Sequence, residues 1–131
     1  MSVKDWVKKS VGFKSHVTIC DKKPTIGWGR NLYDVGISKA EADYLFENDF
    51  NRAEKSLSPY LWFYNQPSNI QDSLLNLCFN MGIENLMSFK KMRAAILKKE
   101  YSLAAMELLN SSWAKKNEEL AKDIAVKIRE G

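Results

Sequence analysis

Residues 37–57 read "ISKAEADYLFENDFNRAEKSL", and this stretch predicts one long helix around which the rest of the chain must be arranged. Ser38 stands where an N-cap is expected and Glu41 follows three residues later, which is the pattern of a capping box. An apolar face then runs along the helix through Leu45, Phe46 and Ala53. Because Pro59 ends the pattern, we expect the helix to cover about 38–56.

The chain before this helix has two parts of different character. Val3, Val7 and Val11 recur at helical spacing and Gly12 follows them, which predicts a short helix over 3–11. The next stretch, 17–33, reads "VTICDKKPTIGWGRNLY". It is rich in β-branched residues and interrupted by proline and glycine, which indicates a small β-ribbon with irregular turns.

The chain after the long helix is predicted to contain helices alone. Pro67 and Ser68 open a helix that runs through "IQDSLLNLCFNMG" and ends at Gly82. We expect Ser88 to cap "FKKMRAAILKKE", Ser102 to cap "LAAMELLNSSW", and a last helix over about 118–129. The fold class is therefore α+β and predominantly helical, with its sheet confined to one small lobe.

Composition limits the chemistry of the 131-residue chain. Cys20 and Cys78 show no metal-ligand spacing, so we expect both to be reduced, with Cys78 buried in its apolar helical run. His16 is the single histidine, which excludes a zinc site of several histidines and argues against a nucleophile activated by histidine. We expect neither a metal nor a cofactor. The net charge of +4 favours approach to an anionic surface, such as a cell wall or a nucleic acid, without identifying either.

The N-terminal stretch "MSVKDWVKKS" lacks the apolar core of a signal peptide, and the strongest apolar run, "LWF", is far too short to span a membrane. We therefore expect synthesis in a host cytoplasm, with no membrane insertion. The periplasm or cell wall would be reached only through export by another protein. We also expect a monomer that does not bind nucleic acid.

Five blocks follow one another in the chain: "GF" at 12–13, "PTIGWGRNL" at 24–32, "GISKAEADYLFENDF" at 36–50, "FNMG" at 79–82, and Phe89 with "AAMELLNSSW" at 104–113. Their order and separation resemble the phage-type lysozyme family over roughly 3–130. The resemblance implies one bilobal, lysozyme-like domain over 1–131. It has a small β-containing lobe over about 12–37, a connecting helix over about 38–56, and a helical lobe over about 57–131 against which the helix 3–11 packs. It also implies cleavage of the bond between N-acetylmuramic acid and N-acetylglucosamine in peptidoglycan.

Members of this family use a Glu directly before "GF", an Asp or Cys in the first β turn, and the Thr of "TIG". This chain has Val11 at the first position, and a valine cannot donate the proton that the leaving sugar oxygen needs. Because the turn is one residue shorter, counting forward from "GF" puts Cys20 at the second position, and counting back from Thr25 puts Ile19 there. The resemblance thus implies catalytic positions at Thr25, Cys20 and the adjacent Asp21, beside a vacant acid position at Val11.

A second departure concerns the partner of the acid. In active relatives an Arg about seven residues after the Trp of the C-terminal lobe approaches the catalytic Glu, and the same count from Trp113 gives Leu120. The acid and its basic partner are thus both aliphatic here, which leaves no buried charge unpaired. Val11 also has a purely structural interpretation, because it completes the stripe of Val3 and Val7.

The resemblance implies that Phe79, Asn80 and Arg30 bind substrate. Phe79 and Asn80 fit a helix that merely packs equally well. Trp28 and Tyr33 are either platforms for a sugar ring or residues that pack the small lobe.

Three functions remain open. The first is a degenerate homologue without efficient hydrolysis, whose cleft still holds a glycan or another ligand. The second is an active muramidase whose acid has moved to Asp21, Glu118 or Glu119. The third is a protein-binding regulator on a lysozyme scaffold, since fold does not fix function. The partner is accordingly a peptidoglycan glycan strand or an unknown protein. The two vacant positions favour the first and third functions, and the preserved fold motifs favour the second.

Overall fold

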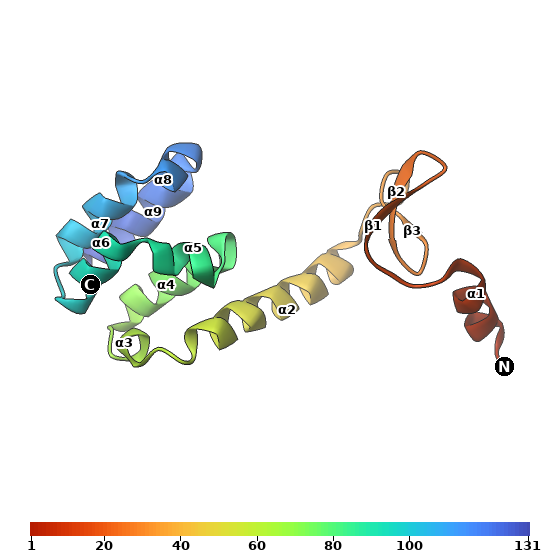
Figure 1. The fold of residues 1–131 in the computed structure, drawn as a ribbon, viewed down its shortest axis with the longest axis horizontal. Coiled ribbons are helices and arrows are strands. Elements are labelled where there is room, and N and C mark those ends of the chain that lie inside the picture. Colours follow the sequence, from red (N-terminus) through yellow and green to blue (C-terminus); the bar gives the residue numbers. More distant parts are fainter. The chain divides into compact units, whose positions relative to one another are not determined.

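The computed structural model describes residues 1–131 and is mostly helical, with one three-stranded antiparallel sheet near the N-terminus (Figure 1). This confirms the predicted α+β class. The chain divides into two compact units, Met1–Phe46 and Glu47–Gly131, and the division falls within the long helix α2, Lys39–Leu57. The helix α1, Val3–Val11, belongs to the first unit together with the sheet, and its packing on the helical lobe stays a prediction.

Both ends of α1 are fixed by local chemistry. The Ser2 hydroxyl accepts a hydrogen bond from the Asp5 amide at 3.1 Å, and the Asp5 carboxylate accepts one from the Ser2 amide, which completes a capping box. Gly12, with a φ of 76°, terminates the helix where the sequence predicts. No residue of α1 is buried, so Val3, Val7 and Val11 lie on an exposed face.

The sheet is a hairpin extended by one short strand. Its strands are β1, Lys14–Cys20, β2, Lys23–Gly27, and β3, Arg30–Asn31, in the order β1-β2-β3. Asp21 and Lys22 connect β1 to β2 with φ values of 50° and 67°. Positive φ at both central residues is the signature of a type I′ turn, whose twist matches that of the flanking strands. The predicted β-ribbon is confirmed, although β1 begins at Lys14 rather than near position 17.

Helix α2 begins as the sequence predicts. The Glu41 amide donates to the Ser38 hydroxyl at 3.1 Å, and the Ser38 amide donates to the Glu41 carboxylate at 2.8 Å. The predicted apolar face is confirmed only at its C-terminal end, because Ala53 is buried whereas Leu45 and Phe46 stay 50% and 47% exposed.

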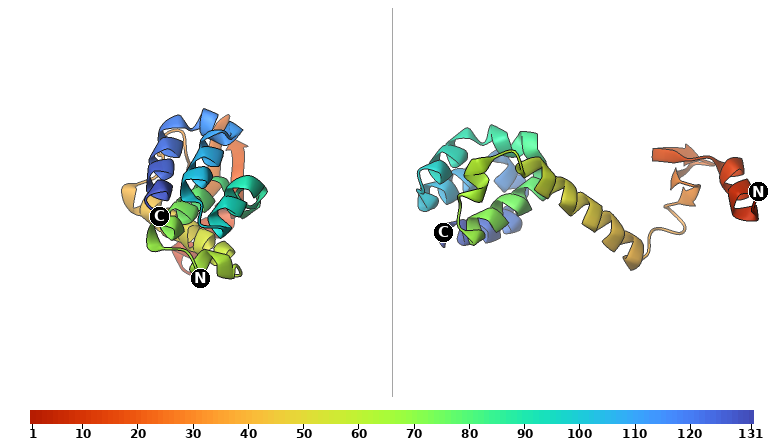
Figure 2. Two further views of the ribbon diagram at one scale, coloured as in Figure 1. Left: turned by 90° about the vertical axis from the view of Figure 1, so that its left-hand side faces the viewer. Right: turned by 90° about the horizontal axis from the view of Figure 1, so that it is seen from below.

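The second unit contains the hydrophobic core. After α2 its helices are α3, Leu61–Tyr64; α4, Ser68–Met81; α5, Ile83–Ser88; α6, Lys90–Leu97; α7, Tyr101–Leu109; α8, Ser112–Lys116; and α9, Glu118–Arg129. Helix α7 packs against α6 and α9, and α4 packs against α9 (Figure 2). Leu57, Leu77 and Leu108 are completely buried among them. Every buried residue lies in this unit, so the first unit has no buried core of its own.

The predicted cap at Ser88 is wrong. Ser88 is the last residue of α5, and its hydroxyl donates back to the Asn85 carbonyl. Helix α6 starts at Lys90 after Phe89, whose side chain offers no hydrogen-bond acceptor to the free amides. Phe89 therefore stands at the N-cap of α6, and no side chain caps this helix.

The predicted cap at Ser102 is also wrong. Helix α7 begins one residue earlier, at Tyr101, with Glu100 at its N-cap. The serine that caps a helix in this region is Ser111, whose hydroxyl accepts from the Ala114 amide at 3.1 Å and so starts α8. Trp113 therefore belongs to α8 and not to the helix before it.

Both cysteines are free, as predicted, and Cys78 is buried whereas Cys20 is exposed. None of the helices combines the length and the apolar character that crossing a bilayer requires.

Candidate functional site

The register of the first hairpin decides which residue shares a face with Thr25. Thr18 lies opposite Thr25, Ile19 opposite Pro24, and Cys20 opposite Lys23. Directly opposed residues point to the same side of a sheet and successive residues point to opposite sides. Cys20 therefore lies on the face of Thr25, and Ile19 lies on the other face. Of the two alignments that the short turn left open, this register favours Cys20.

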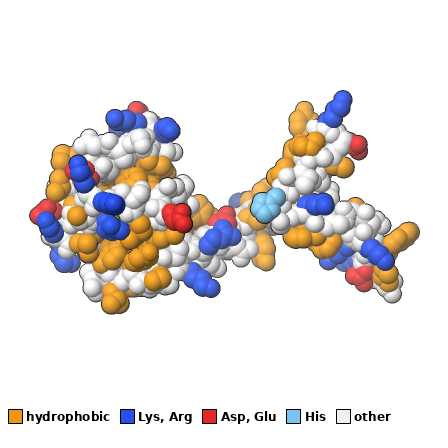
Figure 3. Space-filling model, viewed as in Figure 1, with side chains coloured by type: hydrophobic (Ala, Val, Ile, Leu, Met, Phe, Trp, Pro, Cys, Tyr) orange, Lys and Arg blue, Asp and Glu red, His pale blue; other side chains and the backbone are white.

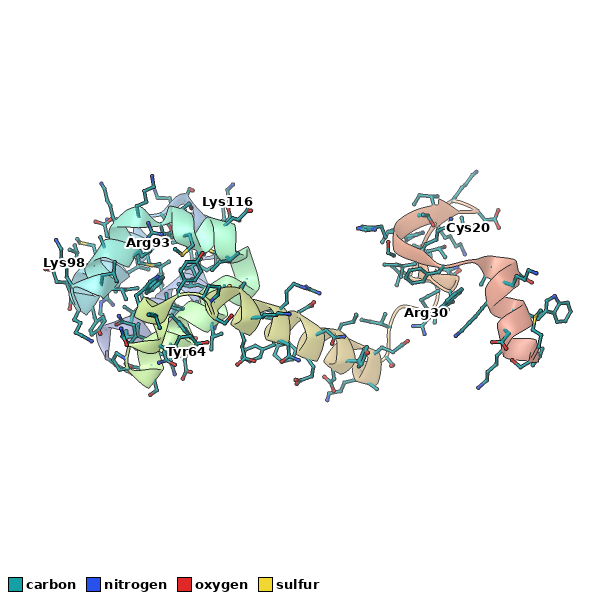
Figure 4. The ribbon with its side chains drawn as sticks, turned by 60° about the horizontal axis from the view of Figure 1, so that its bottom comes forward. Cys20, Arg30, Tyr64, Arg93, Lys98 and Lys116 are labelled. Carbon is teal, nitrogen blue, oxygen red and sulfur yellow. The ribbon has the colours of Figure 1, made fainter.

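The side chain of Thr25 is half-buried in the middle of β2. Its hydroxyl donates to the Lys23 carbonyl at 3.2 Å, and its own carbonyl accepts from the Thr18 hydroxyl at 3.4 Å. The Thr25 proton is thus used within the hairpin, while the hydroxyl oxygen keeps its capacity to accept a hydrogen bond. Cys20 lies at the end of β1, next to the turn that carries Asp21 (Figure 4).

Val11 is the last residue of α1 and lies against the turn between β2 and β3. A Cβ atom added to Gly29 would lie 3.5 Å from the Cβ of Val11. Gly29 has a φ of 80°, a conformation that side-chain-bearing residues rarely adopt, so the glycine permits the turn that lies beside Val11. The position expected to hold the acid is thus occupied by a packed aliphatic side chain, 47% exposed.

Four of the five carboxylates of the first unit are engaged elsewhere. Asp5 closes the cap of α1, Asp34 pairs with Lys23, Glu41 pairs with Arg30, and Asp43 pairs with Lys39. Asp21 remains, on the exposed turn of the hairpin. Asp21 is therefore the one carboxylate of the first unit without a hydrogen bond or ion pair among those described above.

Arg30 joins the sheet to the start of α2. Its guanidinium donates to both carboxylate oxygens of Glu41 and, at 3.0 Å, to the Gly36 carbonyl. The hydrogen bond from Arg30, followed by the bond from the Ser38 amide, lowers the pKa of Glu41 from 4.5 to about 2. The hydrogen bond to Glu41 likewise raises the pKa of Arg30. The predicted substrate-binding Arg30 is therefore held in an internal ion pair, and sequence reasoning, which saw Glu41 only as a capping residue, missed that pair.

Phe79 lines a pocket of about 440 Å³ in the second unit. Its lining residues are Asp49, Arg52, Ala53, Ser56, Cys78, Phe79, Gly82 and Ile83. Asp49 and Arg52 form an ion pair at 3.1 Å, and the Ser56 hydroxyl lies 3.2 Å from the buried Cys78 sulfur. Sequence reasoning identified Phe79 but not the polar residues from α2, because their approach to α4 depends on tertiary packing.

Asn80 does not line this pocket. Its side-chain amide donates to the Asn76 carbonyl at 2.9 Å and to the Asn76 side-chain oxygen at 2.7 Å, one turn back along α4. Phe79 and Asn80 were predicted to act together, but the structure brings only Phe79 to the pocket.

Two aromatic residues of the first unit, Trp28 and Tyr44, border a wider hollow of about 630 Å³. Trp28 lines it, lies 5.4 Å from the ring of Phe13 and carries the Lys8 ammonium 5.1 Å from its own ring. Tyr33 is 76% exposed, with the Lys23 ammonium 5.6 Å from its ring. Trp28 thus both packs and lines a hollow, whereas Tyr33 does little packing.

The remaining predicted positions lie at the start of α9. Glu118 and Glu119 occupy its first turn, where their charge complements the helix dipole. Leu120 is half-buried against the core of the second unit. No group of three or more His, Cys, Asp or Glu side chains is placed to hold a metal ion.

Comparison with known proteins shows the family to which the chain belongs. The family model described as "Phage lysozyme" matches residues 8–129. Two proteins of Dictyostelium discoideum are similar to this chain over 81 residues: "Probable T4-type lysozyme 2" at 38% identity and "Probable T4-type lysozyme 1" at 36%. Each alignment covers 59% of this chain and 48% of the relative, so the chain spans about half the length of the curated relatives it matches. The family match extends from the end of α1 to the end of α9 and includes the sheet, α2 and the pocket around Phe79. By this match, the chain belongs to the phage lysozyme family.

Proposed function

We propose that this protein binds the glycan strand of peptidoglycan and that it hydrolyses the strand very slowly or not at all. The observation that carries the proposal is the aliphatic side chain of Val11, at the position where the family resemblance implies the general acid. The leaving sugar oxygen must be protonated as the glycosidic bond breaks. Loss of general acid catalysis alone costs about 10²–10⁴-fold in rate.

The charges of the first unit support this proposal. A general acid must hold its proton near neutral pH, so its pKa has to be raised. The carboxyl of Glu41 behaves in the opposite way, because Arg30 and Ser38 lower its pKa to about 2. Cys20 lies on the face of Thr25, and because the family resemblance allows an Asp or a Cys at this position, the proposed loss of hydrolysis rests on Val11 and not on Cys20.

The pocket beside Phe79 supports the binding half of the proposal. A sugar presents apolar ring faces and a rim of hydroxyl and acetamido groups. Phe79 and Ile83 offer apolar surface, and the ion pair of Asp49 with Arg52 offers charged hydrogen-bonding groups beside it. This combination suits one sugar unit of a longer strand.

A binding assay with insoluble peptidoglycan tests the first half of the proposal. We expect the protein to co-sediment with the glycan, and Phe79→Ala to weaken binding by about tenfold, a loss typical of a well-packed aromatic contact. Asn80→Ala is the matched control, because Asn80 is on the same helix but bonds to Asn76. Equal loss of binding in both variants, or no binding by the parent protein, would favour a scaffold that recognises a protein partner.

A turbidity assay on a peptidoglycan suspension tests the second half. We expect no clearing by the unmodified protein over times in which an active muramidase clears the suspension. The second candidate function, an active enzyme with a relocated acid, rests on the exposed Asp21 next to Cys20. Clearing that Asp21→Asn abolishes would establish it, and would overturn the loss of hydrolysis proposed here.

Reaching the wall is part of the same proposal. We infer that the protein acts as a monomer, and that its access to the periplasm or cell wall depends on another protein that exports it or opens the membrane.

A further inference from the structure

We propose that α6 and the turn after it form a docking surface for a phosphate-bearing polymer of the cell envelope, separate from the pocket beside Phe79. The choice of an envelope polymer rests on the proposed glycan-binding function. The surface consists of five cations, which we call the α6 basic cluster: Lys90, Lys91, Arg93, Lys98 and Lys99. The fifteen residues 85–99 contain all five and no acidic residue.

The cluster surrounds the exposed part of its helix. Met92, Ala95 and Ile96 are buried and fix the inward face of α6. At 100° per residue, Lys90 falls opposite this face, Lys91 and Lys98 flank it on one side, and the half-buried Arg93 flanks it on the other. Figure 4 shows Arg93 and Lys98 extending from this part of the helical unit, and Figure 3 shows Lys and Arg side chains standing out from its surface.

The five charges are not neutralised within the molecule. The ion pairs of the structure involve none of them, and Arg93 has only the Met87 sulfur, 3.8 Å from its guanidinium, as a partner. Three acidic residues border this area: Glu84 and Glu100 flank residues 85–99 in the sequence, and Glu107 lines a depression of about 400 Å³ beside the start of α6 with Lys90, Lys91 and Ser111. Positive potential therefore remains on this surface for an external anion.

Two features of the α6 basic cluster lower the stability of the folded protein. Lys90 and Lys91 occupy the first turn of α6, where the helix dipole is positive and no side chain caps the free amides. Lys99 adopts a φ of 59°, a left-handed conformation that favours glycine. Lysine at these three positions does not stabilise the fold, which agrees with a role outside it.

The surroundings favour an envelope polymer over a nucleic acid. Proteins that hold single-stranded nucleic acid stack bases on exposed aromatic rings. Phe89 packs against the core, and the hydroxyl of Tyr101 donates to Gln66 at 2.8 Å, so neither ring stands free beside the cluster. Flexible cations without a stacking platform suit repeated phosphodiesters on a chain without bases.

The probe for the test is synthetic poly(glycerol phosphate), and the variant is the double change Lys90→Glu with Lys91→Glu. We expect binding at low salt to weaken by at least about tenfold and its dependence on salt concentration to become shallower, because fewer counterions are released. The melting temperature should stay the same or rise, because acidic residues in the first turn complement the helix dipole. Loss of binding in a variant that is at least as stable cannot be attributed to unfolding.

The matched control is Lys116→Glu with Lys122→Glu, which changes the net charge by the same amount on α8 and α9. We expect binding to fall by less than about threefold, the modest effect of net charge alone. Equal losses in the two double variants would overturn the proposal, as would failure of the parent protein to bind the probe. Tighter binding of single-stranded DNA with the same number of phosphates, through Lys90 and Lys91, would assign the surface to nucleic acid instead.

Binding of uncharged peptidoglycan glycan, measured with the same proteins, separates the two proposals. The Lys90 and Lys91 variant should bind it like the parent, because neither lysine lines the pocket beside Phe79. Binding of poly(glycerol phosphate) without binding of the glycan would refute the proposed function and leave the docking surface standing.

Discussion

At the scale of single residues, Val11 and Lys99 illustrate two ways in which a side chain departs from what its position favours. Val11 departs chemically, because its family position calls for a proton donor. Lys99 departs conformationally, because a φ of 59° calls for glycine. The first departure concerns activity and the second concerns stability, so they are tested by different measurements.

Restoring the acid alone should not restore lysis. Val11→Glu supplies a carboxyl, but the cationic partner that the family resemblance implies at position 120 is a leucine, and Cys20 supplies no carboxylate to position water. We expect activity on peptidoglycan to rise from Val11→Glu alone to its combination with Leu120→Arg, and to rise again when Cys20→Asp is added. The full gain should approach the roughly 10²–10⁴-fold that a general acid contributes. Val11→Gln is the control, alone and in each combination, because glutamine has the shape of glutamate but no acidic proton. Equal activity of the Gln and Glu variants would show that the new carboxyl does not act as a general acid.

Lys99→Gly should stabilise the second unit. Lys99 follows the end of α6 in a Schellman motif, with its amide bonded to the Ile96 carbonyl at 2.9 Å and the next amide bonded to the Ala95 carbonyl at 2.8 Å. Glycine relieves the left-handed strain and offsets part of that gain through its larger unfolded-state entropy, so we expect about 1 kcal/mol in chemical denaturation. Lys98→Gly is the matched control, because Lys98 has a φ of −88° and gains nothing from glycine. A larger stabilisation from the control than from Lys99→Gly would contradict the strain.

At the scale of elements, the junction between the sheet and α2 depends on one ion pair. Arg30 bonds to Glu41 and to the Gly36 carbonyl, so it connects β3, the linker and the first turn of α2. Glu41 also closes the capping box with Ser38. One carboxylate therefore maintains both the start of α2 and its connection to the sheet.

This junction should weaken in acid. The folded-state pKa of Glu41, about 2, is below its ordinary 4.5, so its contribution is fully present above pH 4.5 and is lost as the pH falls toward 2. We expect the loss of stability between pH 5 and pH 2, followed by circular dichroism, to be steeper for the parent than for Glu41→Gln. Glutamine keeps an acceptor for the cap and removes the charge, so parallel curves for the two proteins would show that the ion pair contributes nothing.

The sequence predicted elements well where local chemistry decides them, as at Ser38 and Glu41 of α2 or at Gly12 and Gly82, which end α1 and α4. It failed at Ser88 and Ser102, where a serine has several possible backbone partners and the packing of α5 and α7 selects among them. The short helices α3, α5 and α8 escaped prediction because a helix of four to six residues has too few positions to show a period. At the site, the roles assigned to the positions of Val11 and Thr25 stay predictions, the strand register favours Cys20 over Ile19, and only tertiary packing showed the partner of Arg30.

At the scale of the whole molecule, the two units differ in how they are stabilised. The second unit contains every buried residue, and the first relies on a three-stranded sheet and a short helix, with all of its aromatic side chains exposed. A sheet this small is marginal without a buried face. The stability of the chain therefore comes mostly from residues beyond Phe46.

A fragment of residues 38–131 should consequently fold by itself, because it retains the cap of α2 and the complete core. We expect cooperative thermal unfolding and a strongly helical circular dichroism spectrum. Residues 1–46 alone should show neither, since units this short seldom fold without a disulfide or a metal. Cooperative unfolding of the short fragment would mean that the sheet and α1 bury more surface than the structure shows.

The two thiols differ in exposure, so their rates of alkylation report on two different processes in the same molecule. Cys20, exposed at the end of β1, should be alkylated by iodoacetamide at the rate of a free peptide thiol. Cys78 is 3% exposed, so the reagent can reach it only when α4 opens away from Ser56 and from the carbonyl of Ala53. In one mass spectrum the first label therefore measures elapsed reagent exposure, and the second counts how often the helical core opens.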